Sequence, residues 1–230
     1  MKIIPLGHAS LRLEIADQIL LIDPWLEGNP MFPDERRSDA LASATAIFLT
    51  HGHFDHAAEI EAIAKETGAP VFAIVELAGW ISQSLKIEAT GFNKGGTITL
   101  GDVTVTMVNA THSSSLPVSD QLIYAGSEAG FMISGEGHTI YISGDTDVMA
   151  DMQVFNALHA PDIGILCAGG HFTMDMHRAA FAARTFFNFK TVIPYHYKTF
   201  PLLEQSADEM IKNLPGVQVI EPEPMVAIEI

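Results

Sequence analysis

Residues 51–56 read His-Gly-His-Phe-Asp-His and directly follow Ala46–Thr50, an apolar run typical of a buried strand. At this composition, random placement would produce an H-x-H-x-D-H match in roughly one of 10³ chains of this length. Three imidazoles and a carboxylate within six residues are costly to desolvate together unless something binds them. His51 and His53 point to the same face of an extended segment, whereas Asp55 suits the N-cap of a following helix. The hexapeptide can therefore present two pairs of ligands, from the end of a strand and the start of a helix, to two neighbouring points.

Short apolar runs alternate with helical patterns over nearly the whole chain, which predicts an α/β protein. In the first half we expect strands at Lys2–Leu6, Ser10–Ile15, Gln18–Ile22, Ala46–Thr50 and Val71–Val75, and helices at Asp55–Thr67 and Glu76–Leu85. In the second half we expect strands at Thr97–Leu100, Val103–Asn109, Gln121–Ala125, Gly130–Ile133, Thr139–Ser143, Ile163–Leu166, Val192–Pro194 and Val226–Ile230, and helices at Asp175–Phe187 and Leu203–Asn213. The polar residues 28–39 are expected to form a surface loop. The pattern predicts one domain over residues 1–230, with strands before helices in each half.

The composition excludes several classes of protein. Apolar residues make up 48% of the 230 residues and charged residues 17%, so the chain can bury a sizeable core and general disorder is excluded. The formal net charge of −16 would repel phosphate backbones, which argues against nucleic acid as a partner. The single cysteine, Cys167, excludes a disulfide framework and a thiolate-rich zinc module, and we expect it to be a buried apolar side chain.

Neither a membrane helix nor a targeting segment is expected. No apolar run reaches the roughly 18 residues that a membrane helix needs. The N-terminus lacks the unbroken apolar stretch of a signal peptide. We therefore expect a cytoplasmic protein without membrane insertion. No interface motif is visible, so the oligomeric state, homo-oligomers included, stays open.

Three further ligand candidates lie far from the hexapeptide in the sequence. His112, Asp145 and His196 each stand just beyond the C-terminal end of a predicted strand, where α/β enzymes usually place their chemistry. Zinc and similar divalent ions bind imidazole nitrogen and carboxylate oxygen. These residues can therefore supply the ligands that one hexapeptide cannot.

Together, the hexapeptide, His112, Gly144-Asp145-Thr146 and His196 resemble the metallo-β-lactamase superfamily. With the opening strands and Ile22-Asp23-Pro24, the resemblance spans nearly the whole chain. Four segments further resemble the uncharacterised bacterial metal-dependent hydrolases of that superfamily: GHASLRLE, DPWLEGNP, GGHFTM and IPYHYKTF. Relatives of this group include the ascorbate-6-phosphate lactonases and, more distantly, the N-acylphosphatidylethanolamine phospholipases D. Asp147 and Met174-Asp175-Met176-His177 depart from the pattern of the group, which leaves the substrate-facing wall undefined.

This resemblance implies a four-layer αββα sandwich with two divalent metal ions at one edge, between its two sheets. It also implies how the ligands divide: His51, His53 and His112 for the first ion, Asp55, His56 and His196 for the second, and Asp145 bridging both. A bridging water would act as the nucleophile, with Asp55 accepting or orienting its proton. Asp23 would brace the histidine loop from behind. Zinc is the first expectation, although manganese, nickel and iron accept the same ligands.

Three other side chains are candidates for substrate binding. His8 follows the first predicted strand, His171 lies in a Gly-Gly-His-Phe-Thr loop, and Tyr195 precedes His196. His171 could donate a hydrogen bond to a developing oxyanion, and Tyr195 could protonate a leaving group. The alternatives are backbone bracing by His8, a structural role for His171 and packing by Tyr195.

The implied function is that of a metal-dependent hydrolase acting on an ester, lactone, thioester or phosphodiester of a small molecule. His53 stands where the flavo-diiron branch has Glu. Asp145 stands where many true metallo-β-lactamases have Cys, which argues against antibiotic hydrolysis. Two alternatives stay open. A mono-iron, sulfur-oxidising oxidoreductase of the same fold would use fewer than the seven ligands. A non-catalytic metal-binding protein would need a site sealed from solvent.

Overall fold

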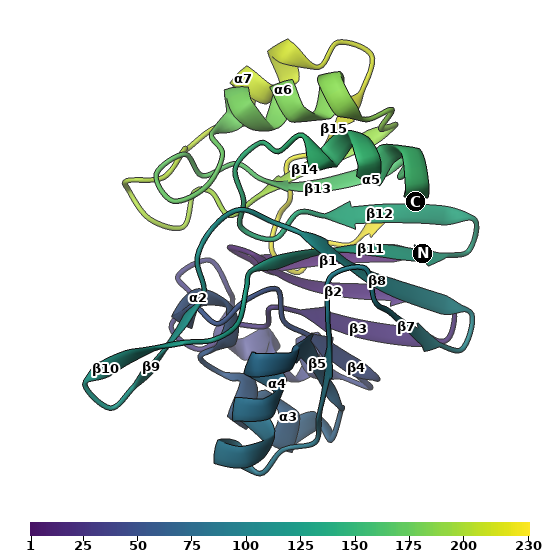
Figure 1. The fold of residues 1–230 in the computed structure, drawn as a ribbon. Coiled ribbons are helices and arrows are strands. Elements are labelled where there is room, and N and C mark those ends of the chain that lie inside the picture. Colours follow the sequence, from purple (N-terminus) through teal and green to yellow (C-terminus); the bar gives the residue numbers. More distant parts are fainter.

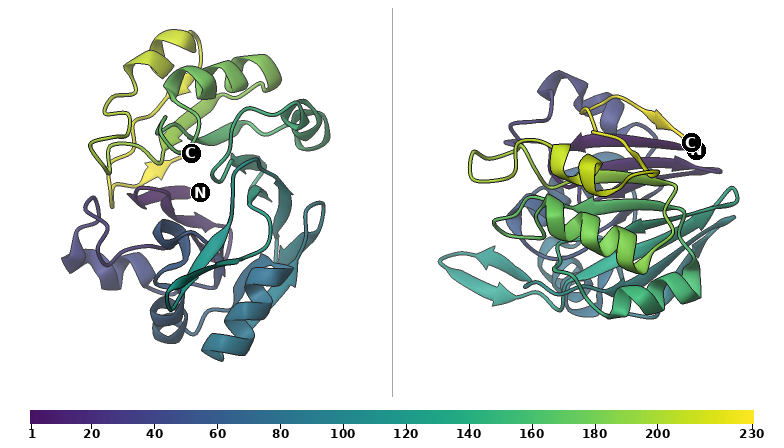
Figure 2. Two further views of the ribbon diagram at one scale, coloured as in Figure 1. Left: turned by 60° about the vertical axis from the view of Figure 1, so that its left-hand side comes forward. Right: turned by 90° about the horizontal axis from the view of Figure 1, so that it is seen from above.

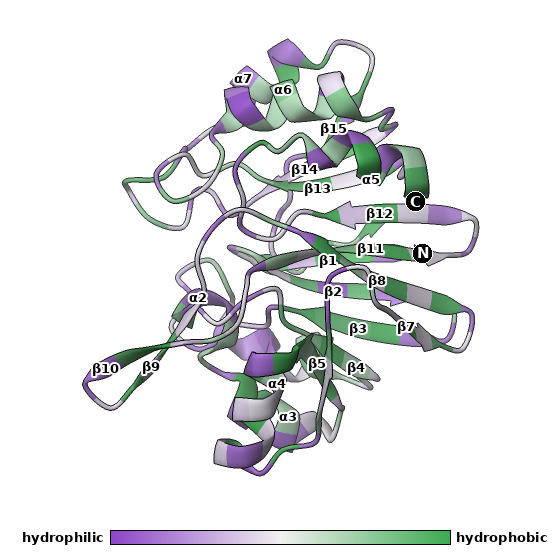
Figure 3. Cartoon of the chain, in the orientation of Figure 1, coloured by the Kyte–Doolittle hydropathy of each residue, from purple (hydrophilic) through white to green (hydrophobic).

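Two seven-stranded β-sheets pack face to face in the computed structural model, which describes residues 1–230 (Figure 1). Helices lie on the outer side of each sheet, which gives the expected αββα layers, and Figure 2 shows the arrangement from two further directions. Aromatic rings from both sheets meet in the interior, where the ring centroids of Phe48 and Phe131 lie 5.6 Å apart. Hydrophobic residues are concentrated along the strands (Figure 3). Removing these inner faces from water favours the closed sandwich.

The first sheet is built by the first half of the chain and by its last residues. Its order is β16-β1-β2-β3-β4-β5-β6. The strands are β1 (Lys2–Gly7), β2 (Ser10–Ile15), β3 (Gln18–Ile22), β4 (Ala46–Phe48), β5 (Val71–Ile74), β6 (Ala89–Phe92) and β16 (Ile228–Glu229). The first three form an antiparallel meander, and β3 to β6 run parallel. Its helices are η1 (Asp34–Arg36), α1 (Arg37–Leu41), α2 (Phe54–Ala57), α3 (Ile60–Thr67), α4 (Val75–Trp80) and η2 (Ile81–Leu85).

The second sheet repeats this plan with the second half of the chain. Its order is β15-β14-β13-β12-β11-β8-β7. The strands are β7 (Thr97–Leu100), β8 (Val103–Asn109), β11 (Ala129–Gly135), β12 (His138–Ile142), β13 (Ile163–Cys167), β14 (Thr191–Tyr195) and β15 (Gln218–Val219). β7 to β12 pair antiparallel and β12 to β15 parallel. Its helices are α5 (Asp151–His159), α6 (Met176–Phe186) and α7 (Asp208–Asn213).

A separate hairpin, β9 (Ser115–Val118) and β10 (Gln121–Tyr124), forms a two-stranded sheet of its own. It projects from the body of the molecule on the same side as α2 (Figure 1). The hairpin therefore lies at the edge of the sandwich at which β4 leads into α2.

The helix expected over residues 55–67 is instead two helices, α2 and α3. Glu59 lies between them and turns its carboxylate toward the segment after β3. There it accepts hydrogen bonds from the backbone N–H groups of Leu26 and Glu27, and Arg37 donates to it at 2.8 Å. These long-range partners interrupt the helix, and α2 is a single turn directly after the hexapeptide's first histidines.

The remaining differences from expectation are local. Residues 28–39, expected as a loop, include η1 and the start of α1, and the sequence pattern did not predict α5, β6, β9 or β15. The helix expected over 203–213 is confined to α7, because the backbone N–H of Glu204 donates instead to the carbonyl of Gly169 at 2.9 Å. The last strand, expected over 226–230, is shortened to β16. None of the helices is both long and apolar enough to cross a membrane.

Candidate metal centre

All seven expected ligands gather at one edge of the sandwich, where strands of both sheets end. The hexapeptide 51–56 follows β4 of the first sheet. His112, Asp145 and His196 follow β8, β12 and β14 of the second sheet. His8, which follows β1, joins them. The nitrogen and oxygen atoms of these side chains form three overlapping groups, each spanning no more than 4.8 Å.

The first group consists of His51, His53 and His112. Nε2 of His51 lies 3.0 Å from Nδ1 of His53, and the ring centroids of His53 and His112 are 5.1 Å apart. His51 is fully buried, whereas His53 and His112 are partly exposed. The three side chains therefore place three ring nitrogens close together, on a side of the cluster that solvent can reach.

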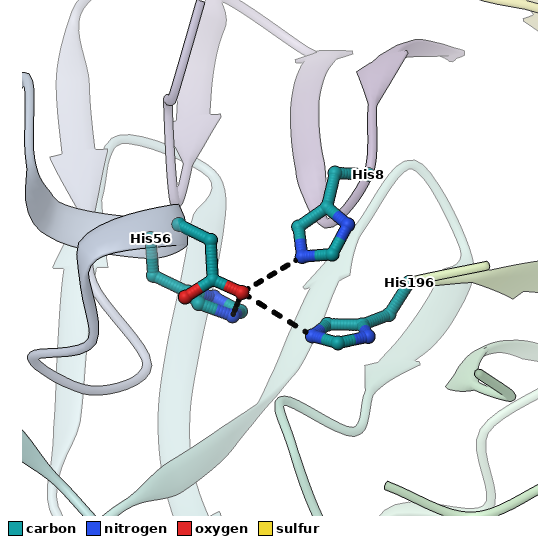
Figure 4. A group of neighbouring side chains, drawn as sticks. His8, His56 and His196 are labelled. Carbon is teal, nitrogen blue, oxygen red and sulfur yellow. Dashed lines mark hydrogen bonds and ion pairs between the residues drawn. The ribbon is translucent and has the colours of Figure 1, made fainter. Parts of the chain in front are cut away.

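The second group consists of His8, Asp55, His56 and His196, drawn in Figure 4. Oδ2 of Asp55 is its centre. It lies 2.9 Å from Nε2 of His8, 3.6 Å from Nε2 of His196 and 3.8 Å from Nε2 of His56. Figure 4 shows the three rings converging on this carboxylate. His8 thus contacts the expected ligand set directly.

Asp145 lies between the two groups. Its Oδ2 is 3.0 Å from Nε2 of His196, 3.5 Å from His56, 3.6 Å from His112 and 3.9 Å from His51. Its side chain is 2% exposed. One carboxylate oxygen therefore faces imidazoles of both groups at once.

Asp23 supports the histidines from behind and is fully buried. Its carboxylate accepts hydrogen bonds from the backbone N–H of Thr50 at 2.7 Å, from the Thr50 hydroxyl at 2.6 Å and from Nδ1 of His56 at 2.8 Å. Because the Thr50 hydroxyl gives its proton to Asp23, it must accept the proton of His51 Nδ1, 3.0 Å away. This network places a proton on Nδ1 of both His51 and His56, so that their Nε2 atoms face the centre and are the ones available to a cation.

Several buried atoms at the centre have no hydrogen-bond partner in the protein. They are Nε2 of His56, Nε2 of His196 and Oδ1 of Asp145. Buried polar atoms are nearly always paired, so this group requires an explanation. Imidazole nitrogen and carboxylate oxygen are the ligands that zinc and similar ions prefer. The residues present fit divalent metal ions.

Burial and neighbouring charges shift the pKa values of these side chains in different directions. Burial and the adjacent His56 hold the pKa of His51 well below its ordinary value. Burial also disfavours charge on His196, but Asp145 outweighs it and raises the His196 pKa to about 9. The pKa of Asp145 itself falls well below its usual range despite burial, because of His196 and His56. Ionised carboxylate therefore lies among the imidazoles, which favours a bound cation.

Unusual backbone conformations set the positions of these side chains. Three residues of the cluster and its support have left-handed backbone: His8 (φ 53°), Asp23 (φ 45°) and His196 (φ 60°). Such conformations are uncommon for non-glycine residues and persist only where the surroundings enforce them. Gly144, also left-handed at φ 62°, precedes Asp145, and a Cβ there would lie 2.2 Å from the carbonyl oxygen of Ala129. Only glycine therefore fits immediately before Asp145.

A cleft of about 390 Å³ opens over the centre. Five of the seven expected ligands reach its wall: His53, Asp55, His112, Asp145 and His196. The wall also includes three large apolar side chains that no sequence motif indicated, Phe54, Leu122 and Phe172. For Leu122 the available sequence signal was the strand expected over 121–125, which carries apolar residues on both faces, and no such signal marks Phe54 or Phe172.

None of the three expected substrate-binding residues lines this cleft. His8 lies behind Asp55, with its Nδ1 2.8 Å from the hydroxyl of Thr199, a partner that the sequence analysis did not identify. His171 is exposed and faces a separate open hollow beside Gly169 and Gly170. Tyr195 is 2% exposed, and its hydroxyl has no hydrogen-bond partner. The geometry favours bracing for His8 and packing for Tyr195.

Cys167 ends β13 and is fully buried, as the sequence predicts. Burial, with a contribution from Asp145, raises the pKa of its thiol to about 12. Because the thiolate is the reactive form, we expect a thiol reagent at pH 8 to label the folded protein more than about a hundredfold slower than the guanidinium-unfolded chain. Equal rates would contradict the buried position.

The raised pKa also means that this group stabilises the fold below the ordinary thiol pKa, and that the contribution is lost as pH rises toward 12.

Comparison with known proteins agrees with this geometry. The family model described as "Beta-lactamase superfamily domain" matches residues 18–197. The chain is 64% identical to a UPF0173 metal-dependent hydrolase of Dinoroseobacter shibae, over 100% of both chains. Among solved structures, Igni18, a metallo hydrolase of the archaeon Ignicoccus hospitalis, is 29% identical with a TM-score of 0.85, over 100% of this chain and 98% of that one.

YhfI of Bacillus subtilis, a metallo-β-lactamase fold protein, superposes with a TM-score of 0.75 over 99% of both chains. At 15% identity it shows the fold alone. The two sheets, the histidine cluster at their edge, the family model and the relatives at high identity all lead to one assignment. The chain belongs to the metallo-β-lactamase superfamily and is one of its metal-dependent hydrolases.

Proposed function

We propose that this chain, as a single domain, hydrolyses an ester, lactone, thioester or phosphodiester of a small molecule at a centre of two divalent metal ions. The observation that carries the proposal is the position of Asp145, whose Oδ2 lies 3.0 to 3.9 Å from the Nε2 atoms of four histidines in two groups. One carboxylate shared by two sets of nitrogens is suited to bridging two cations.

Each group of side chains would hold one ion. His51, His53 and His112 would bind the first, and Asp55, His56 and His196 the second, with Asp145 between them. When bound, two divalent ions lower the pKa of a shared water and polarise the bond to be broken. Zinc suits this mixture of nitrogen and oxygen ligands, and manganese, nickel and iron are alternatives for the metal analysis below.

Asp55 is the side chain best placed to handle a proton. It reaches the cleft wall, and its pKa lies far below the usual range, despite the opposing effect of burial, because of His56, His196 and His8. It is therefore ionised at neutral pH and suited to orient a water by accepting its hydrogen bond, whereas a carboxylate of such low pKa is a weak base for taking the proton itself. His8 donates to its Oδ2 at 2.9 Å and so holds the carboxylate in one orientation.

The other two candidate functions have less support. A mono-iron oxidoreductase would leave most of the seven side chains without a metal to bind. A non-catalytic binding protein needs a closed site, whereas five of the candidate ligands reach an open cleft of about 390 Å³.

Metal content tests the proposal. We expect elemental analysis of protein purified without chelator to find close to two zinc or manganese ions per chain. The variant His112→Ala should hold fewer, whereas His138→Ala, whose histidine pairs with Asp162 at 2.8 Å outside the centre, should hold as many as the unchanged protein. Activity toward ester and phosphodiester substrates should follow metal content. A single iron per chain would favour the oxidoreductase. No metal after reconstitution would contradict the proposal.

A further inference from the structure

The β9–β10 hairpin carries apolar side chains on both faces. Leu122 pairs with Pro117 and Ile123 with Leu116. Because side chains alternate across a strand, these pairs lie on opposite faces of the hairpin. Leu116 is 6% exposed and Ile123 packs against the core, so this face anchors the hairpin. Pro117 and Leu122 line the cleft instead.

Two phenylalanines continue this apolar wall. Phe54 comes from α2, and Phe172 from the loop between β13 and α6. The exposed fractions of Phe54, Phe172 and Leu122 are 53%, 52% and 75%. Leaving three large apolar side chains in water around one cleft is unfavourable, and such exposed groupings mark binding sites. The wall is therefore suited to an apolar part of a ligand.

The charges of the cleft also favour a ligand without charged groups of its own. Its wall contains no lysine or arginine, and all its titratable side chains belong to the candidate ligand set: His53, Asp55, His112, Asp145 and His196. The whole chain has a net charge of −16. A phosphate or carboxylate placed away from the reacting bond would find no protein cation to pair with it.

We infer that the cleft selects a neutral carboxylic ester, thioester or lactone whose apolar acyl arm lies over Phe54, Leu122 and Phe172. The inference rests on the proposed function and narrows its substrates to carbon centres. Water adds to the carbonyl carbon, the bond from that carbon to the leaving oxygen or sulfur breaks, and the leaving group takes up a proton. The products are a carboxylic acid and an alcohol or thiol, or one hydroxy acid from a lactone.

Binding of hydroxamic acids tests the inference without requiring turnover. Straight-chain hydroxamic acids from acetyl to octanoyl carry the same metal-binding headgroup on arms of increasing length. On metal-loaded protein, we expect calorimetry to show that Kd falls about two- to fourfold with each added methylene. The variant Leu122→Ala should weaken binding of the octanoyl compound about tenfold and that of the acetyl compound less than about twofold.

A matched control exists on α5. Leu158 is 73% exposed, close to the 75% of Leu122, but does not line the cleft, so Leu158→Ala should change neither affinity. Phe172→Ala, on a different element, should reproduce the Leu122→Ala result if the hairpin variant fails to fold.

The alternative outcomes are distinguishable. Affinity that does not change with arm length, in protein that holds its metal, would overturn this inference and leave the proposed function standing. Faster hydrolysis of bis(4-nitrophenyl) phosphate than of 4-nitrophenyl octanoate would also overturn this inference and leave the proposed function standing. Protein that retains no metal after reconstitution would bind no hydroxamate, and the proposed function would fail along with the inference.

Discussion

Replacing Asp145 with asparagine is expected to lower kcat/KM for ester hydrolysis about a thousandfold, equivalent to about 4 kcal/mol of transition-state stabilisation. The amide keeps the shape of the side chain but removes the negative charge that faces four imidazoles. The metal content should fall below two ions per chain. Elemental analysis and steady-state kinetics on the same preparations measure both effects.

Asp147→Asn is the matched control for this substitution. Asp147 lies two residues farther along the chain, and its exposed carboxylate accepts hydrogen bonds from Arg178 at 2.7 and 2.8 Å. Loss of an exposed pair costs little, so metal content and activity should stay close to those of the unchanged protein. If Asp145→Asn retained both ions and activity within tenfold, Asp145 would not be the shared ligand.

The second large effect concerns stability. Asp23→Ala is expected to lower the free energy of unfolding by about 3–5 kcal/mol, because it leaves the buried N–H and hydroxyl of Thr50 and the Nδ1–H of His56 without an acceptor. For a chain of this size the melting temperature should fall by roughly 6–20 °C. Metal affinity should also fall about 10- to 100-fold, because the tautomers of His51 and His56 are no longer fixed.

Thermal unfolding of metal-free protein separates the two consequences of Asp23→Ala, since any loss of stability measured there owes nothing to bound metal. Asp39→Ala serves as the comparison, because the Asp39 carboxylate is 60% exposed and pairs only with Arg36 on the surface. A melting temperature of Asp23→Ala within about 2 °C of that of Asp39→Ala would mean that the buried network contributes little.

The sequence predicts which side chains converge at the edge of the sandwich, because these candidate ligands obey local rules. The hexapeptide places four candidate ligands after one strand, and His112, Asp145 and His196 each follow another strand end. The strand bounds of β2, β3, β7 and β8 match expectation because period-two alternation and turn residues are both strong there.

The structural features that the sequence did not predict depend on contacts between residues far apart in the chain. Glu59 interrupts a helix through Arg37 and backbone groups far away in the chain. His8 faces Asp55, 47 positions away, and Thr199, 191 positions away, so its place behind the centre follows only from the packing of the two sheets. β9 contains Pro117, which weakens any strand pattern, and its partner β10 carries apolar residues on both faces.

The candidate ligands are divided between the two sheets, so the stability of the folded chain should depend on bound metal. The hexapeptide belongs to one half and His112, Asp145 and His196 to the other, so neither half alone could hold the proposed ions. Bound metal would link the two sheets. By mass action, each tenfold rise in free metal concentration above the dissociation constant would add about 1.4 kcal/mol per site to the free energy needed to separate the two halves. The supply of metal would then set how long the chain survives proteases as well as how fast it turns over substrate.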